Sequence, residues 1–333
     1  MVEAADFITI PYTPDLSQAG IRRACQQLAL ERLPKDEDPL TGLFQCQYQT
    51  ALELALLRYL QENEIPFERQ AAAPLTAPED MDLVVGGRRV VLRNFPITSK
   101  NQIRRLLDEP EFILNGWARL PQEHGEVDAL RADDVYIFAF IAALVAQQGL
   151  EFRRALRAQQ PCYLIHLLPE GWAHRGDHPS LDHLALKADI DQEIRLELGG
   201  QDTDRQFYSE WIDLPPRQRV QTRAEIQSLA YLHTVQLPEG RLGLHSPGLD
   251  QLHMIEPESW FNVWAYGMRI VLTGFIPRHE FQRKAYLVTQ AEASPEMEAN
   301  PYIKLPIAQL YPMQALFEQA RLWKSPGGMG AEK

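Results

Sequence analysis

The feature that most constrains the fold of this chain is a pair of β-rich segments joined by two glycines. Residues 81–85 and 88–93 are rich in valine and leucine, and Gly86 and Gly87 lie between them. The favoured two-residue hairpin turns need positive φ angles, which glycine adopts without steric cost. The sequence therefore predicts a β-hairpin here, with the rest of a sheet built around it.

Helical and extended segments flank the hairpin. A helix is predicted over 17–32, and apolar residues recur at helical spacing over 43–63, which predicts an amphipathic helix. An extended segment at 65–69 and an Ala/Pro-rich loop at 71–78 follow. Beyond the hairpin, Thr98 or Ser99 is expected to cap a helix through Leu107. Residues 133–140 predict a buried strand that continues into a helix near 142–148.

The pattern changes in the second half of the chain. Short β-rich runs at 162–168, 193–198, 210–214 and 228–235 are separated by proline and glycine, which predicts an antiparallel β module. A strand and a helix are expected over 262–281. The segment 267–275 resembles 87–95, and we favour one strand-to-helix pattern used twice over an internal duplication.

Composition narrows the function classes. The chain has 333 residues, 45% of them hydrophobic, and a net charge of -12, which weighs against constitutive nucleic-acid binding unless basic residues gather on one face. No run approaches the roughly 18 apolar residues of a spanning helix, and the acidic start lacks the character of a signal peptide. The three cysteines are far apart and predict neither disulfides nor a Cys-x-x-Cys metal site. We therefore expect a cytoplasmic protein without membrane partners.

The order of these elements resembles the PD-(D/E)xK restriction-endonuclease-like family. It runs from a helix with Glu53 through a strand with Asp82, a hairpin turn, a strand ending in Arg93 and a helix to the buried strand from Val135. The resemblance implies a helix glutamate, an aspartate before the hairpin and an acid-x-lysine on the next strand, together surrounding one or two magnesium ions. Such ions bind carboxylate oxygens and polarise a phosphodiester.

The family pattern is only partly kept. Glu53 and Asp82 match, but Val91 stands where the family has the second strand acid, and Arg93 stands where it has lysine. Valine offers no ligand atom, and arginine cannot lose its proton to activate a water. We therefore expect a remnant catalytic site of Glu53, Asp82 and Arg93. Asp82 and Glu53 would hold Mg²⁺ only if the protein were active, and no other cofactor is expected.

The expected fold is mixed α/β, with a restriction-endonuclease-like core sheet flanked by helices and a β-rich second module. The expected segments are an N-terminal strand and helix (1–40), the core (41–149), the β-rich insertion or second module (150–260), the closing strand and helices (261–324) and a disordered tail (325–333).

The expected function is non-catalytic recognition of a protein or a nucleic acid. Lys100, Arg104 and Arg105 are candidate contacts to a nucleic-acid backbone, with an ordinary solvated helix face as the favoured alternative. A second hypothesis is an active Mg²⁺-dependent endonuclease in which a replacement carboxylate such as Glu68 enters the site. A third is a structural or assembly protein that uses the β module.

Two further clusters have simpler interpretations. The stretch 174–183 holds three histidines and two aspartates, but its glycine and proline disfavour a helix, so a solvated loop is preferred over a metal site. The aromatics Trp260, Phe261, Trp264 and Tyr266 are expected to pack in a core rather than to stack on a ligand.

Overall fold

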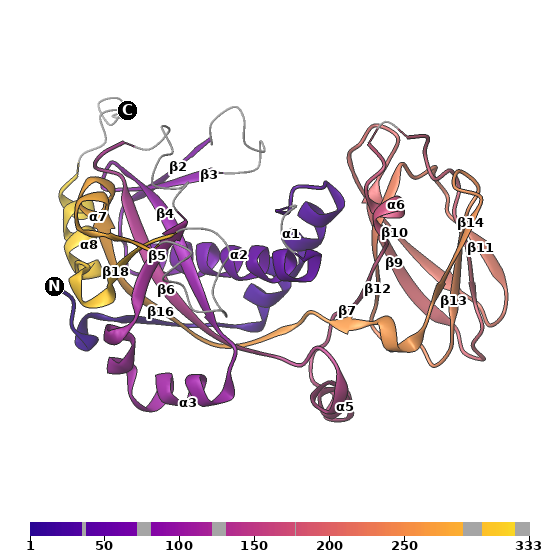
Figure 1. Ribbon diagram of the computed structural model, residues 1–333, viewed down its shortest axis with the longest axis horizontal. Coiled ribbons are helices and arrows are strands. Elements are labelled where there is room, and N and C mark those ends of the chain that lie inside the picture. Colours follow the sequence, from indigo (N-terminus) through magenta and orange to yellow (C-terminus); the bar gives the residue numbers. More distant parts are fainter. Residues whose placement is uncertain (35–37, 72–80, 122–130, 177, 289–301, 324–333) are drawn as a thin grey trace, which may run out of the picture. The chain divides into compact units, whose positions relative to one another are not determined.

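The computed structural model describes residues 1–34, 38–71, 81–121, 131–176, 178–288 and 302–323. The chain divides into two compact units (Figure 1). Unit 1 consists of Met1–Thr13, Ala51–Leu144 and Gly267–Lys333, and unit 2 of Pro14–Thr50 and Val145–Tyr266. The expected tail at 325–333 and most of the expected loop at 71–78 lie outside the described residues.

Unit 1 is built on a six-stranded sheet in the order β1-β16-β6-β4-β3-β2. These strands are β1 (Ile8–Pro11), β16 (Ala265–Pro277), β6 (Val135–Val145), β4 (Arg88–Ile97), β3 (Met81–Val85) and β2 (Phe67–Ala71). A three-stranded sheet joins β17 (Tyr286–Val288), β18 (Tyr302–Pro306) and β5 (Trp117–Pro121). The α-helices are the end of α2 (Pro39–Glu62), α3 (Lys100–Asp108), α7 (Arg278–Lys284) and α8 (Met313–Leu322), with 3-10 turns η1 (Ala4–Asp6), η2 (Pro110–Asn115) and η4 (Ile307–Gln309).

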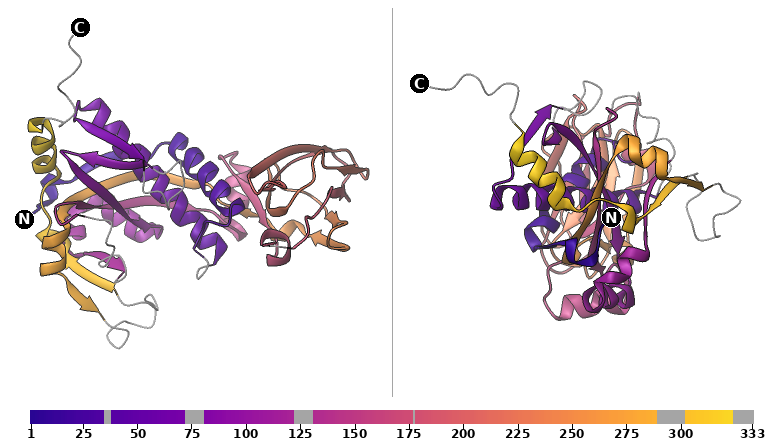
Figure 2. Two further views of the ribbon diagram at one scale, coloured as in Figure 1. Left: turned by 90° about the horizontal axis from the view of Figure 1, so that it is seen from above. Right: turned by 90° about the vertical axis from the view of Figure 1, so that its left-hand side faces the viewer.

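The predicted hairpin is confirmed as β3 and β4. The two strands are antiparallel, and Gly86 and Gly87 turn the chain with φ angles of +60° and +75°. The end of α8 packs on this turn, as Figures 1 and 2 show: a Cβ on Gly87 would lie 2.7 Å from Nε1 of Trp323. Both the conformation and the close approach favour glycine here.

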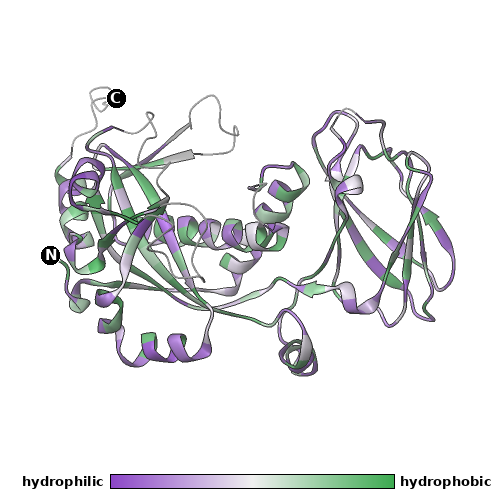
Figure 3. Ribbon diagram, viewed as in Figure 1, coloured by the Kyte–Doolittle hydropathy of each residue, from purple (hydrophilic) through white to green (hydrophobic). Residues whose placement is uncertain are grey.

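Strand β6 lies in the middle of the sheet, parallel to β4. A parallel pair needs a crossover, which α3, η2 and β5 supply. The predicted helix near 142–148 is wrong, because β6 runs on to Val145 and helix α5 (Gly149–Arg157) begins after it. Strands β4 and β16 border β6 on both sides and pair with its backbone. Its side chains are largely apolar (Figure 3) and most of them are buried, as expected for a central strand that is covered on both faces. The two similar segments, 87–95 and 267–275, fall on these two neighbours of β6.

Helix α3 confirms the helix predicted after the hairpin, but not the side-chain cap. Ser99 is the N-cap residue in an extended conformation, and its hydroxyl makes no capping hydrogen bond. Ser99 is exposed, so water can satisfy the free amides of this helix start.

Unit 2 contains two antiparallel sheets, which confirms the expected antiparallel strands. The five-stranded sheet runs β10 (Phe207–Leu214), β9 (Ile194–Gln201), β12 (Ser228–Thr234), β7 (Leu164–Leu167) and β15 (Phe261–Asn262). The four-stranded sheet runs β11 (Arg219–Gln221), β8 (Ala185–Ala188), β13 (Leu242–Ser246) and β14 (Gln251–Ile255). Helices α1 (Pro14–Ala29), the start of α2, α5 and α6 (Glu170–Ala173) complete the unit, with a 3-10 turn η3 (Pro257–Ser259).

The five-stranded sheet has apolar layers on both faces. One cluster joins it to the four-stranded sheet and includes Leu229 and Leu232 of β12. A second cluster joins it to α1 and includes Ala230 and Tyr231 of the same strand. Every residue of β12 is therefore buried, which explains why this strand lacks a polar alternation.

None of the described helices is both long enough and apolar enough to cross a membrane.

Candidate functional site

Arg93 lies on an apolar face of the unit 1 sheet. Val91 and Phe95, two positions away on either side in β4, both pack against a cluster that includes Tyr136. Alternation along the strand gives Arg93 the same face. Burial lowers the pKa of Arg93, and Tyr136 opposes that shift. The Nε atom of Arg93 is buried and has no hydrogen-bond acceptor, which is costly for a charged donor.

Tyr136 of β6 links Arg93 to a second arginine. Burial raises the pKa of Tyr136, whereas the charges of Arg278 and Arg93 and a hydrogen bond from Arg278 lower it. Arg278 is the first residue of α7. The middle of β4, the start of β6 and the start of α7 thus bring two guanidinium groups to one phenol. We call Arg93, Tyr136 and Arg278 the arginine cluster.

A carboxylate that acts on Tyr136, that of Asp134, is held by backbone amides. Its side chain is buried, and its two oxygens accept hydrogen bonds from the amides of Arg89 (3.0 Å) and Arg131 (2.7 Å). These bonds tie the start of β4 to the start of β6. Asp134 raises the pKa of Tyr136, but it does not contribute to the pKa shift of Arg93. It is a structural group at the edge of the arginine cluster.

The predicted acids belong to the same unit as the arginine cluster. Glu53 lies in α2, where it is partly buried and already has an interaction partner. Asp82 lies in β3 opposite Gln70 of β2, and its side chain falls outside the described part of the chain. Glu68, the proposed replacement ligand, lies in β2 opposite Val84 and also has a partner.

The basic residues of α3 are exposed. The guanidinium of Arg105 lies 3.8 Å from Glu109 and 5.0 Å from the ring centre of Phe112, which ties this charge to its own helix. Lys100 has an interaction partner as well. Arg104 is exposed, whereas Ile103 and Leu106 of the same helix are buried.

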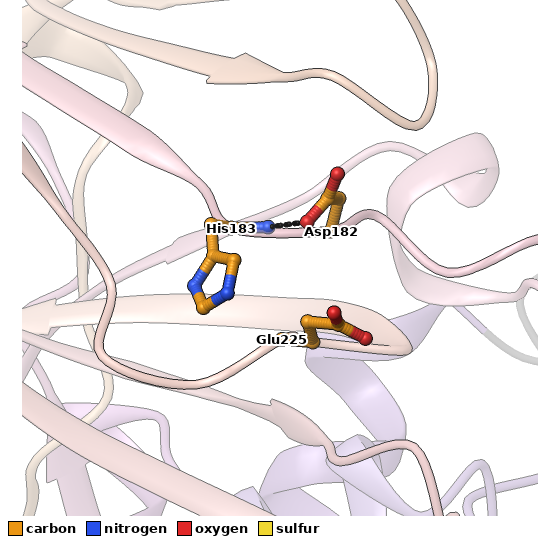
Figure 4. A group of neighbouring side chains, drawn as sticks. All are labelled: Asp182, His183 and Glu225. Atoms are coloured by element: carbon orange, nitrogen blue, oxygen red, sulfur yellow. Dashed lines mark hydrogen bonds between the residues drawn. The ribbon is translucent and has the colours of Figure 1, made fainter.

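The structure brings a different set of metal-ligating groups together in unit 2. Asp182, His183 and Glu225 each offer one ligand atom, and these atoms lie within 4.8 Å of one another (Figure 4). The Nδ1 atom of His183 lies 3.2 Å from the carbonyl oxygen of Thr222. With its proton assigned to Nδ1 for that bond, the ring keeps a lone pair on Nε2.

The predicted loop at 174–183 contributes only its last two residues to this trio. His174 and His178 are exposed, and Asp177 lies outside the described residues. Glu225 comes from a distant part of the sequence, and nothing in its local pattern marks it as a ligand. Arg278 was missed for the same reason, although its place directly after the long apolar run of β16 marked a strand end.

The aromatic and histidine groups of unit 2 serve packing. Trp260 is buried in the cluster between the two sheets, as the sequence predicted. The ring centres of His166 and Trp260 are 5.9 Å apart, and the Nε2 atoms of His166 and His253 are 3.1 Å apart. Burial is the main cause that lowers the pKa of both histidines.

Comparison with protein families, with curated proteins and with solved structures finds no match for this chain.

Proposed function

We propose that this chain is a non-catalytic binding protein on a degenerate restriction-endonuclease-like core, and that it recognises the phosphate backbone of a nucleic acid. The order of elements supports the ancestry: α2, an antiparallel run of β2, β3 and β4, then α3 and the parallel strand β6. This is the order on which the family resemblance rests. Unit 2 would then be an addition to that core.

The observation that carries the proposal is the environment of Arg93. In an active member of the family, this strand face would present an acid and a lysine to a metal ion. Here Val91 packs into an apolar cluster, and Arg93 is drawn into the same face with a buried Nε that has no acceptor. Hydrocarbon cannot coordinate Mg²⁺, and a guanidinium repels it.

The same groups suit a phosphate. Arginine recognises phosphate oxygens through a planar fork of N–H donors, and partial burial strengthens such charge-assisted bonds. Arg278, which is only partly buried, adds a second guanidinium. The chain carries a net charge of -12, so binding depends on this local cluster and not on long-range attraction.

Binding and cleavage assays test the proposal together. Labelled single- and double-stranded DNA and RNA are titrated with the full chain at low salt, and the same substrates are incubated with Mg²⁺ or Mn²⁺. We expect binding without cleavage. Arg93→Ala should weaken binding by about 1.5–3 kcal/mol, roughly 10- to 150-fold, because it removes a charged hydrogen-bonding group. Arg69→Ala, which removes an exposed arginine of β2, is the matched control and should change affinity little.

Other outcomes point to the other functions. Metal-dependent cleavage that Asp82→Ala abolishes would identify a nuclease with a rearranged site, to which Glu53 and Glu68 are the candidate contributors. If no nucleic acid binds and a pulldown recovers only protein, insensitive to salt, recognition or assembly of proteins replaces our proposal.

A further inference from the structure

We propose that Asp182, His183 and Glu225 form a Zn²⁺ site in unit 2. This inference is independent of the proposed function of unit 1. It starts from one carboxylate oxygen of each acid and one ring nitrogen of the histidine, all within 4.8 Å of one another.

The spacing is close to that of a bound ion. Zinc binds nitrogen and oxygen ligands at about 2.0–2.2 Å, so ligand atoms around one tetrahedral ion lie roughly 3.4 Å apart. Asp182 and His183 are adjacent in sequence and partly buried, whereas Glu225 is exposed. A rotation of the Glu225 side chain can supply the remaining approach, and it disturbs no buried contact.

The two segments that supply the ligands are fixed to each other by backbone hydrogen bonds. The amide of Leu181 donates to the carbonyl of Ile226 (2.8 Å), and the amide of Ile226 donates to the carbonyl of Asp182 (3.3 Å). The amide of Leu184 donates to the hydroxyl of Thr222 (3.0 Å), and the amide of Thr222 donates to the carbonyl of Leu184 (2.9 Å). The ligands therefore project from a frame that exists before any ion binds, which lowers the cost of ordering them.

The charges of the trio also favour a cation. Among the residues that the structure describes, no lysine or arginine forms an ion pair with Asp182 or Glu225. The neighbouring Arg223 is engaged elsewhere: its Nε lies 3.6 Å from Glu210, and its amide lies 3.2 Å from the same carboxylate. Two adjacent carboxylates without a counter-charge repel each other, and a divalent ion removes that repulsion.

The ligand types select the metal. An imidazole nitrogen suits zinc and its transition-metal neighbours, whereas Mg²⁺ and Ca²⁺ prefer oxygen ligands alone. The Nδ1 bond of His183 to the carbonyl of Thr222 is the outer-shell contact that commonly orients a zinc-bound histidine. Three protein ligands leave a fourth position for water.

Asp182→Asn is the sharpest variant. Asp182 has a φ of +64°, which asparagine tolerates, and asparagine retains the oxygen that accepts the His183 amide at 2.7 Å. The substitution therefore removes the charge and leaves the frame intact. His183→Ala and Glu225→Gln remove the other two ligands, and His174→Ala, in the exposed part of the same loop, is the matched control.

The full chain, stripped of metal with a chelator, is titrated with Zn²⁺ against a chromophoric indicator, and separately with Co²⁺ by visible absorption. We expect one site per chain. Loss of an outer-shell partner costs about 10- to 100-fold in affinity, so each ligand variant should lose at least about tenfold, while His174→Ala should leave the affinity unchanged. Circular dichroism of each variant establishes that the fold is retained.

The proposal is overturned if the wild-type chain takes up no Zn²⁺, or if folded Asp182→Asn and Glu225→Gln bind it as the wild type does. An equal loss in His174→Ala would assign the binding to scattered surface histidines. If Mg²⁺ at the same concentration displaced Zn²⁺, the assignment of the metal class would be wrong.

Discussion

Two buried histidines should make the stability of unit 2 depend steeply on pH. His166 of β7 and His233 of β12 are 7% and 4% exposed, and burial lowers the pKa of each to about 4. With the proton assigned to Nδ1, the ring of His233 donates to the carbonyl of Leu164 at 2.9 Å, and that of His166 to the carbonyl of Ser259 at 3.2 Å. Burial favours the neutral form of both rings, and these donated hydrogen bonds oppose it only in part.

The size of the effect follows from the two pKa values of each histidine. In the unfolded chain, both histidines titrate near the ordinary histidine pKa of 6.5. Between pH 6.5 and 4, the unfolded state therefore binds protons that the folded state does not bind. Stability is then complete above pH 6.5 and falls as the pH drops, by about 1.4 kcal/mol per pH unit and histidine. At pH 5 each histidine has removed about 2 kcal/mol and the pair about 4 kcal/mol, a large share of the stability of a typical domain.

Denaturant unfolding at pH 7, 6 and 5, followed by tryptophan fluorescence, measures this loss. Four of the six tryptophans, including the buried Trp172 and Trp260, belong to unit 2, so the signal is weighted towards that unit. His233→Gln keeps a donor for the carbonyl of Leu164 and should lose about 2 kcal/mol less than the wild type between pH 7 and 5. His174→Gln, at an exposed position, serves as the control. If His233→Gln has the same pH slope as the wild type and the control, the argument from burial is refuted.

Three further predictions concern single residues. Gly199→Ala should destabilise unit 2 by about 1–3 kcal/mol or more in thermal or denaturant unfolding, because the added Cβ would overlap the ring of Tyr231. Asp134→Asn should lower the stability of unit 1 by about 2 kcal/mol, since two amides lose a charged acceptor; hydrogen exchange of those amides should rise in parallel. Cys25 is buried with its pKa raised to about 12, so iodoacetamide should modify Cys162 in the folded protein and Cys25 only after unfolding, as peptide mass analysis would establish.

Local signals in the sequence predicted local structure well. The glycine pair at Gly86 and Gly87 defined the hairpin because a positive φ is a requirement of the backbone itself. The end of β6 was missed because an apolar run buried on both faces has no period that separates strand from helix. The pairing of β6 with β4 and β16 makes this segment a strand, and such pairing depends on residues far apart in the sequence.

The two candidate sites show the same contrast between local signals and long-range contacts. The sequence alone could propose Val91 and Arg93 as a pair, because they stand two residues apart in one strand. The partners Tyr136 and Arg278 come from other elements, and only the folded sheet brings them to Arg93. Glu225 joins Asp182 and His183 through the hydrogen bonds between two distant segments. Contacts of this kind carry no spacing rule that a single sequence can reveal.

The arginine cluster gives the proposed ancestry a chemical logic. In a metal-dependent nuclease, carboxylates hold a cation and the cation binds the phosphate, so the protein contacts the phosphate through the metal ion. On the proposed ancestry, Val91 stands in place of an acid and so removes a negative charge, and Arg93 with Arg278 brings positive charge to Tyr136. Under this proposal, a phosphate binds the two guanidinium groups directly, without a metal ion. No group in the cluster remains to polarise the phosphodiester and activate a water together, so affinity for the same anion can persist while cleavage is lost.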